Sequence, residues 1–207
     1  TEGTLADHVN RKEIAKVVIP FIEKTTANEL TITYIETPKD LVFFNGLGGF
    51  SPDGKEYIII TDQKNKTEAP WVNVIANPKF GTVISESGSA YTWTENAHEL
   101  RLSSWNNDPV SDNSGETFYI RDEESGHFWS PTLLPTRSKS NYITRHGFGY
   151  SVFEHIEDGI HTEMTVFVDI ESTIKFTILK IRNQSGRSRK MSATGYVEWV
   201  LGDTRVK

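Results

Sequence analysis

The sequence predicts a mainly β protein that folds as an antiparallel sandwich of large sheets. Short segments rich in β-branched and aromatic residues recur from Leu41 onward, separated by glycine, proline, asparagine and aspartate. The clearest segment, Ile160 to Val168, alternates apolar with polar residues, as expected of a strand with one buried face. After residue 40 no stretch has apolar residues at convincing helical spacing. The sequence therefore predicts sheets joined by turns.

The first forty residues predict a lead-in segment. Apolar residues recur at roughly helical spacing from Leu5 to Ile19 and Pro20 ends the pattern, so one N-terminal helix is expected. Leu30 to Ile35 then predicts a short strand of high β propensity. We therefore divide the chain into residues 1–40, a lead-in helix and linker, and residues 41–207, the β domain.

Twelve strands are expected in the β domain, each bounded by turn residues. They are Leu41 to Phe44, Tyr57 to Thr61, Trp71 to Ile75, Gly81 to Ser85, Ala90 to Thr94, Glu116 to Arg121, His127 to Trp129, Tyr142 to His146, Tyr150 to His155, Ile160 to Val168, Lys175 to Arg182 and Lys190 to Leu201. The segment NQSGRSR between the last two predicts a hairpin loop, with Gly186 available for positive φ. Because the chain stops soon after Leu201, we expect the domain to be truncated at its C-terminal end.

Length, charge and composition narrow the function classes. The chain has 207 residues, a formal net charge of -6 and no cysteine. An acidic chain without a clustered basic stripe argues against a nucleic-acid partner. The absence of cysteine excludes disulfides, thiolate metal sites and a cysteine nucleophile. No apolar run reaches the roughly 18 residues that would span a bilayer, so direct membrane insertion is not expected.

The stretch from Ser85 to Asp108 concentrates aromatic, amide and charged residues, a combination suited to sugar recognition. A pyranose offers an apolar face that stacks on aromatic rings and a rim of hydroxyls that pair with amide, carboxylate and guanidinium groups. Tyr91 and Trp93 are two residues apart, so they share one face of a strand. The candidate sugar-binding residues are Tyr91, Trp93, Glu95, Asn96, Glu99, Arg101, Trp105, Asn107 and Asp108. The competing interpretation is that the aromatic residues are sheet core and that the NNDP segment is a turn.

Other motifs are weak. Asn45 to Phe50 is glycine-rich, but it lacks the third glycine of a dinucleotide fingerprint and predicts a turn. The six histidines show no metal-ligand spacing, so neither a metal nor a cofactor is expected. No GxSxG elbow supports a hydrolase triad. Gly147 to Gly149 and the acidic run from Asp122 to Glu124 both predict hairpin tips.

Five stretches of the chain together resemble a known family. In order they are FFNGLGGFSPDGKEYII, APWVNVIANPKFGTVISESGSAYTWTENAHELRLSSWNNDPVSD, FYIRDEESGHFWSP, RHGFGYSVFEH and GYVEWVLG. They closely resemble the glycoside-phosphorylase-like region of cyclic β-1,2-glucan synthases, which is related to the cellobiose and chitobiose phosphorylases of glycoside hydrolase family 94. The resemblance runs from about Leu41 to Arg205, and residues 1–40 carry no motif of the family.

The resemblance implies a fold and a set of partners. Family members begin with a β super-sandwich of the galactose-mutarotase-like type, followed by an (α/α)6 barrel that holds the catalytic acid and most of the donor-sugar site. Inorganic phosphate is the co-substrate of the parent enzyme, which is expected to be a homodimer. No helical pattern follows residue 40, so the barrel is missing and the fragment alone is expected to be inactive, with no catalytic residue of its own.

Two functions are left open by the sequence. The first is the N-terminal sandwich of a β-1,2-glucan-processing phosphorylase or transferase, acting as scaffold, dimer contact and sugar-cleft wall and binding β-glucan oligosaccharides weakly. The second is a free-standing carbohydrate-binding module. A mutarotase-like epimerase would need a histidine and a carboxylate at a pocket, for which His98 with Glu95 or Glu99 is the available pair. The family further implies a cytoplasmic segment of a membrane-tethered bacterial parent protein.

Overall fold

The computed structural model describes residues 30–106 and 108–202. The described residues form fourteen strands and no helix. The helix expected from Leu5 to Ile19 lies outside them. The strands are β1 (Gly48–Phe50), β2 (Glu56–Thr61), β3 (Val72–Asn77), β4 (Phe80–Ser85), β5 (Ala90–Thr94), β6 (Arg101–Ser103), β7 (Glu116–Asp122), β8 (Phe128–Trp129), β9 (Tyr142–Gly147), β10 (Tyr150–Glu157), β11 (Ile160–Val168), β12 (Lys175–Asn183), β13 (Met191–Val197) and β14 (Trp199–Gly202).

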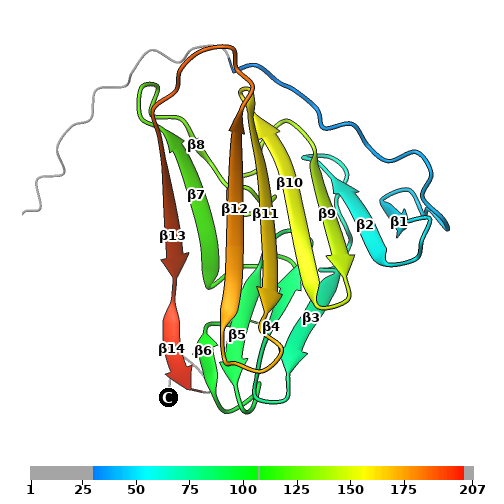
Figure 1. Ribbon diagram of the computed structural model, residues 1–207, viewed down its shortest axis with the longest axis vertical. Coiled ribbons are helices and arrows are strands. Elements are labelled where there is room, and N and C mark those ends of the chain that lie inside the picture. The colour runs from blue at the N-terminus through cyan, green and yellow to red at the C-terminus, as the bar shows by residue number, and fades with distance from the viewer. Residues whose placement is uncertain (1–29, 107, 203–207) are drawn as a thin grey trace, which may run out of the picture.

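The strands form three antiparallel sheets in two layers. A six-stranded sheet, in the order β1-β2-β9-β10-β11-β12, makes one layer. A three-stranded sheet (β13-β7-β8) and a five-stranded sheet (β14-β6-β5-β4-β3) together make the other. Figure 1 shows the six-stranded sheet in front, with the three-stranded sheet behind its upper part and the five-stranded sheet behind its lower part. This arrangement confirms the predicted antiparallel sandwich.

The two layers enclose an apolar core. Ile75, Phe80 and Ile84 of the five-stranded sheet pack in one buried cluster with Phe153 and Met164 of the six-stranded sheet. A second cluster joins Ile120 and Trp129 of the three-stranded sheet to Ile160 of the six-stranded sheet. Strand β11 serves both clusters, and its residues alternate strictly between buried and partly exposed, as its sequence predicts.

Several tight turns also follow the sequence. Strands β9 and β10 form a hairpin in which Tyr150 pairs with Gly147, and Gly149 has a φ of 82°. Strands β7 and β8 are joined by the acidic turn in which Gly126 has a φ of 71°. Gly186 has the expected positive φ, at 73°. These glycines occupy backbone conformations that other residues rarely adopt.

The prediction of a strand from Leu30 to Ile35 is wrong. This segment is extended, but it joins no sheet. Its backbone is instead bonded to two side chains: the Thr31 amide donates to Asp158 Oδ1 at 3.1 Å, and the Ile35 amide donates to Asn141 Oδ1 at 2.8 Å. High β propensity therefore produced an extended chain without a neighbouring strand.

Two further predictions fail in whole or in part in the glycine-rich region near residue 45. Leu41 to Phe44 is not a strand, since Val42 alone forms an isolated bridge to Phe50. The turn predicted for the glycines is confirmed at Gly46, which lies in a bend with a φ of 101°, whereas Gly48 and Gly49 are instead part of β1, where Gly48 pairs with Ile59. A Cβ atom on Gly48 would lie 2.8 Å from the carbonyl oxygen of Ile58, so the strand requires glycine at this close approach.

The last two predicted strands do not form a hairpin. Strand β12 belongs to the six-stranded sheet and β13 to the three-stranded sheet, so the loop between them crosses from one layer to the other. The final strand is also divided at Glu198, whose amide bonds to the Gly115 carbonyl at 2.7 Å. The short strand β6, which has only three residues, was not predicted.

One side of the sandwich is open. Within the described residues, β12, β13 and β14 are each an end strand of their sheet, and Figure 1 shows β13 and β14 along one side of the molecule. Most residues of β13 are exposed, including Tyr196 and Val197, and Trp199 and Leu201 of β14 are 66% and 72% exposed. Unpaired strand edges with apolar residues are adhesive surfaces in solution.

The interlayer core is tested by Phe153→Ala. Phe153 is 1% exposed, and removing its ring should lower the free energy of unfolding by about 3–5 kcal/mol because a cavity remains between the layers. The matched control is Phe148→Ala in the β9–β10 turn, where the side chain is 88% exposed and the expected change is within about 0.5 kcal/mol. Urea denaturation measures both, and equal effects would contradict the assigned core.

Candidate functional site

A row of aromatic side chains lies on the outer face of the five-stranded sheet. The Tyr91 ring lies 5.5 Å from the Trp93 ring and is stacked on the Trp105 ring at 5.4 Å and 25°. Tyr91 and Trp93 share a face because they are two residues apart on β5, while Trp105 follows the end of β6. The three predicted aromatic residues are thus brought together. We call Tyr91, Trp93 and Trp105 the aromatic row.

Arg101 and Gly81 lie next to the rings of the aromatic row. The Arg101 guanidinium carbon lies 5.1 Å from the centre of the Trp105 ring and 5.9 Å from that of Tyr91, and Arg101 is buried. A Cβ atom on Gly81 would lie 2.4 Å from the Trp93 ring, so the indole lies directly across this glycine. Arg101 therefore lies against the rings as their support. Trp105, at 46% exposed, presents the most accessible ring of the row.

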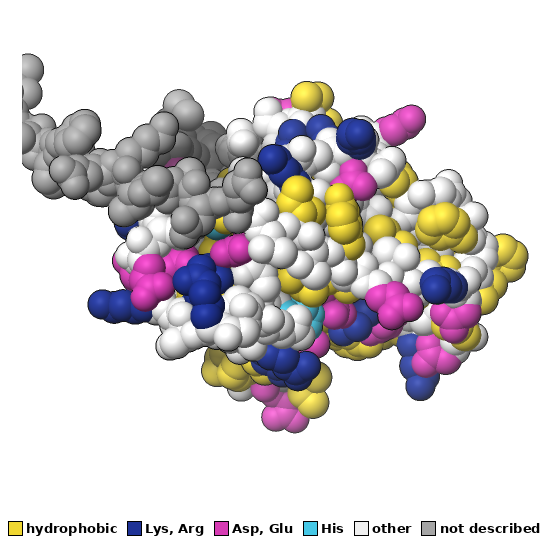
Figure 2. All heavy atoms as spheres, turned by 90° about the horizontal axis from the view of Figure 1, so that it is seen from above, with side chains coloured by type: hydrophobic (Ala, Val, Ile, Leu, Met, Phe, Trp, Pro, Cys, Tyr) yellow, Lys and Arg dark blue, Asp and Glu magenta, His cyan; other side chains and the backbone are white. Residues whose placement is uncertain are grey.

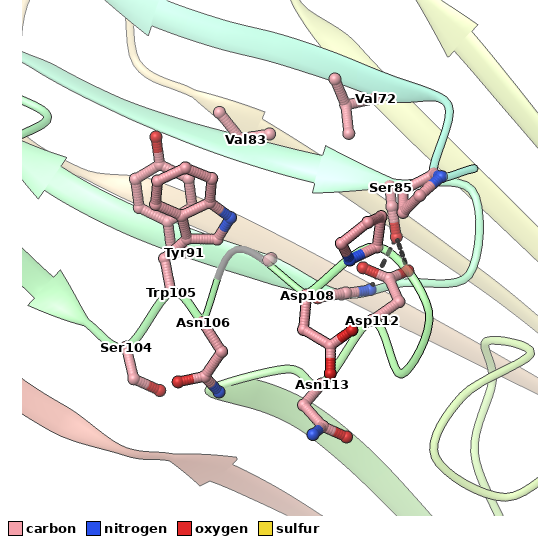
Figure 3. Close-up of a pocket in the computed structure, with 14 residues that line it drawn as sticks. Val72, Val83, Ser85, Tyr91, Ser104, Trp105, Asn106, Asp108, Asp112 and Asn113 are labelled. Carbon is pink, nitrogen blue, oxygen red and sulfur yellow. Dashed lines mark hydrogen bonds between the residues drawn. The ribbon is translucent and has the colours of Figure 1, made fainter.

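A pocket opens beside Trp105. It encloses a volume of about 170 Å³ between strands β3 to β5 and the loop that joins β6 to β7. Figure 3 shows the Tyr91 and Trp105 rings at one end, with Val72 and Val83 across from them. Polar side chains complete the lining: Ser85, Ser89, Ser104, Asn106, Asp108, Asp112 and Asn113. The pocket thus combines an aromatic ring with hydroxyl, amide and carboxylate groups.

A network of hydroxyl groups on Asp112 lies at the end of the pocket away from the Tyr91 and Trp105 rings (Figure 3). The Ser85 hydroxyl donates to Asp112 Oδ2 at 2.8 Å, the Ser87 hydroxyl donates to the same oxygen, and the two hydroxyls lie 2.8 Å apart. Asp112 has a φ of 46°, a conformation that aspartate tolerates better than most residues. This network was not predicted, because Asp112 is distant in sequence from its partners and its positive φ leaves no pattern.

A second, smaller cavity adjoins the pocket. It has a volume of about 60 Å³ and shares Pro70, Pro109 and Asp112 with the first. Its lining includes Glu86, which is 3% exposed and accepts hydrogen bonds from the Thr67 hydroxyl and the Trp71 amide. Burial raises the pKa of Glu86 above its ordinary value in spite of these bonds. The two cavities together make an elongated depression along the edge of the loop from Trp105 to Asn113.

A partly buried ion pair lies beneath the aromatic row. Glu116 of β7 pairs with Lys175 of β12, and Glu116 Oε1 accepts the hydroxyls of Thr92 and Ser103, each at 2.5 Å. Burial alone would raise the pKa of Glu116, but the adjacent Lys175 ammonium and the hydroxyl donors hold that pKa below its ordinary value. Thr92 lies between Tyr91 and Trp93 with its side chain on the opposite face of β5, so this ion pair fixes the strand that carries the rings.

Three of the predicted residues lie away from the pocket, at the tip of the β5–β6 hairpin. Asn96 accepts the backbone amides of His98 and Glu99 at 2.8 and 3.0 Å, which is an Asx turn. His98 Nδ1 lies 2.7 Å from Glu99 Oε1, and both side chains are exposed. Glu95 has a φ of 55° and its amide bonds to the Lys79 carbonyl. Glu95, Asn96 and Glu99 do not line the pocket.

The remaining predicted residues belong to the loop that follows Trp105. Asp108 lines the pocket and accepts the amides of Val110 and Ser111 through Oδ1 at 3.0 and 3.2 Å. Hydrogen bonds from Ser111 and from the Val110 amide lower the pKa of Asp108, so its carboxylate is ionised at neutral pH. Asn107 lies outside the described residues. The loop is therefore a turn whose aspartate bonds the local backbone, as the competing interpretation expected. It nevertheless supplies Asp108 to the pocket lining.

Within residues 30–106 and 108–202, no cluster of three or more histidine, aspartate or glutamate side chains could hold a metal ion. No helix among these residues is long and apolar enough to cross a membrane.

Comparison with protein families identifies the fold. Residues 55–206 match the family model described as "Glycosyl hydrolase 94, supersandwich domain". The chain therefore belongs to glycoside hydrolase family 94, as a supersandwich domain.

Individual relatives are of two kinds. The cyclic beta-(1,2)-glucan synthase of Rhizobium meliloti is 36% identical over 217 aligned residues that cover 98% of this chain. An N,N'-diacetylchitobiose phosphorylase of Vibrio furnissii is 33% identical over 73% of the chain, and a solabiose phosphorylase of Paenibacillus borealis is 28% identical over 75%. The chain spans 8% of the length of the synthase and 19% and 20% of the two phosphorylases.

The ion pair beneath the aromatic row is tested by Lys175→Met. This change leaves the partly buried Glu116 carboxylate without its cation, which should lower the free energy of unfolding by about 1–3 kcal/mol at neutral pH. In the wild type the depressed pKa of Glu116 contributes stability above the ordinary carboxyl pKa, and that stability is lost as the pH falls through the folded-state pKa. The deficit of the variant should therefore shrink on acidification.

The matched control is Lys180→Met, which removes a lysine that pairs with Glu163 but is 68% exposed. Its cost should stay below about 1 kcal/mol. Urea denaturation as a function of pH separates the two, and a Lys175→Met deficit that does not depend on pH would contradict the assignment of an ionised Glu116.

Proposed function

We propose that this chain is the sandwich domain of a β-1,2-glucan-processing glycoside phosphorylase or transferase. In the parent protein it acts as a scaffold, as a dimer contact and as one wall of the sugar cleft of a catalytic helical barrel. The observation that carries the proposal is the pocket beside Trp105, where an aromatic ring faces hydroxyl, amide and carboxylate groups. Inorganic phosphate would be the co-substrate of the parent enzyme.

The chemistry of the pocket supports a sugar ligand. The Tyr91 and Trp105 rings are stacked on each other. Because Trp105 is the more exposed of the two, it offers the apolar surface on which a pyranose could stack. Asp108, Asn106 and Asn113 surround it with acceptors and donors suited to hydroxyl groups. The adjoining cavity at Glu86 extends the depression, which favours an oligosaccharide over a single sugar.

The names of the relatives suggest which glycosidic linkage the ligand has. The synthase that aligns along 98% of the chain is named for cyclic beta-(1,2)-glucan, whereas the phosphorylases align over about three quarters. We therefore propose β-1,2-linked glucan as the ligand. We also propose, from the family resemblance, that the domain is a cytoplasmic segment of a membrane-tethered bacterial parent protein.

The open side of the sandwich supports the scaffold role. Strands β13 and β14 are end strands along one side of the molecule, and exposed Trp199 and Leu201 lie there (Figure 1). Apolar side chains on unpaired strands are a surface that a further part of a larger protein could cover. The catalytic groups would then belong to that larger protein, and the sandwich would contribute binding residues only.

The second candidate is a free-standing carbohydrate-binding module. The aromatic row favours it, because three rings on one flat sheet face can form a complete platform. The two candidates differ in affinity: a cleft wall should bind glucan with a dissociation constant of about 1 mM or weaker, and a complete module should bind at about 1–100 µM.

The proposal is tested by tryptophan-fluorescence titration with linear β-1,2-glucooligosaccharides, with cellooligosaccharides as the linkage control. We expect weak, saturable and linkage-selective binding. Trp105→Ala should weaken it by about tenfold or more, because the variant loses the ring on which the sugar stacks.

The matched control is Trp199→Ala, which removes an exposed indole from β14, away from the pocket. Binding should be unchanged in this variant. An affinity that Trp105→Ala leaves unaltered would contradict the sugar-contact role, and micromolar binding would favour the free-standing module.

A further inference from the structure

The segment that leads into the sandwich is attached to it through hydrogen bonds to the main chain of the segment. From Leu30 to Pro38 it is extended, and its apolar side chains point largely to solvent: Tyr34 is 63% exposed and Ile32 is 49% exposed. Apolar burial is therefore a weak source of attachment for this part of the chain. Three hydrogen bonds to its main chain attach it to the sandwich.

Asn141 binds the main chain of this segment as a neighbouring strand would. Its Oδ1 accepts the Ile35 amide at 2.8 Å, and its Nδ2 donates to the Ile35 carbonyl at 3.0 Å. One side-chain amide thus satisfies both polar groups of one residue. Four residues earlier, the Thr31 amide donates to Asp158 Oδ1 at 3.1 Å. These bonds are made to backbone groups, so they do not depend on the side chains of the segment.

Buried polar groups fix the backbone at Asn141 and the side chain of Asp158. The main-chain carbonyl oxygen of Asn141 lies 3.0 Å from Nδ1 of His155, which is fully buried, stacked on Tyr142 and 3.2 Å from Glu157. Asp158 Oδ2 lies 3.0 Å from Nη2 of Arg189, and the Arg189 side chain is 2% exposed. A site whose groups are already oriented loses little conformational entropy when it binds.

The charges around this site are balanced. Arg189 also pairs with fully buried Asp122, and Arg187 lies 3.9 Å from Asp158. Figure 2 looks down on this end of the molecule, where acidic and basic side chains are interspersed over the visible surface. The site therefore has no strong net field to select a charged partner, which fits recognition of an uncharged main chain.

We propose that Asn141 and Asp158 form a clamp for an extended main chain, which fixes the direction in which residues 30–38 meet the sandwich. The Rhizobium meliloti synthase aligns over 98% of the chain, so its alignment reaches into the lead-in segment, whereas the family model begins at residue 55. The clamp is independent of sugar binding at Trp105.

Hydrogen exchange on the full chain tests the clamp. The amides of Thr31 and Ile35 should exchange slowly in the wild type, and Asn141→Ala should speed exchange at Ile35 by about tenfold or more. Ile35→Pro removes the donated N–H from the segment side and leaves the buried network of Asn141 unchanged, so it should release the segment without lowering the melting temperature. Tyr34→Ser is the matched control, since it alters an exposed side chain and should leave protection intact.

A distance measurement tests the rigid attachment. Because the chain has no cysteine, Glu36→Cys and Ile170→Cys would place one pair of spin labels on the segment and on the exposed β11–β12 turn. We expect a narrow distance distribution that broadens in the Asn141→Ala and Ile35→Pro backgrounds and stays narrow with Tyr34→Ser. Equal distributions in all backgrounds, or unchanged exchange in both clamp variants, would overturn the proposal.

Discussion

One partly buried ion pair, between Glu116 and Lys175, connects all three sheets of this domain. Glu116 comes from the three-stranded sheet, Lys175 from the six-stranded sheet, and the hydroxyls that Glu116 accepts come from Thr92 and Ser103 of the five-stranded sheet. A buried pair of charges costs desolvation energy, so it contributes little net stability, but breaking it is expensive. Its effect is therefore to fix the relative positions of the sheets, which apolar contacts alone leave less well determined.

The candidate site depends on that positioning. Thr92 and Ser103 lie on the inner faces of β5 and β6. The residues on either side of Thr92 are Tyr91 and Trp93, and Trp105 follows Ser103 by two residues, so both strands carry the aromatic row. On the outer face, Gly81 makes room for Trp93, and Arg101 lies against Tyr91 and Trp105. The pocket is thus built on strands, and one loop supplies its polar rim, an arrangement that holds binding groups more precisely than loops alone.

The sequence predicts the sandwich well because period-two patterning is a local property. Strand β11 follows its pattern from end to end, and the boundaries of β5 were predicted without error. The errors come from long-range effects. Leu30 to Ile35 has the composition of a strand, but Asn141 and Asp158 occupy the places where a neighbouring strand would bind. The β12–β13 loop has the residues of a hairpin and instead connects two layers.

The candidate site was partly predictable for the same reason. The alternation of Tyr91 and Trp93 indicates a shared face, and Trp105 could be grouped with them by composition. Asp112 and Glu86 could not be found this way, because the folded chain alone brings them to the pocket. Arg101 and Asn96 have the right chemistry for sugar, but local contacts use them to support the rings and to cap a turn.

The most direct test of the sugar-contact surface is the response of the five tryptophan indole N–H signals to linear β-1,2-glucooligosaccharides, followed by NMR. Trp105 lies at the pocket, whereas Trp129 is 1% exposed in the core and Trp199 lies on β14. If the sugar binds at the pocket, the Trp105 signal should shift most, with saturation at about millimolar sugar, and the Trp129 and Trp199 signals should not shift. A shift confined to Trp199, or no shift at Trp105, would contradict binding at the pocket.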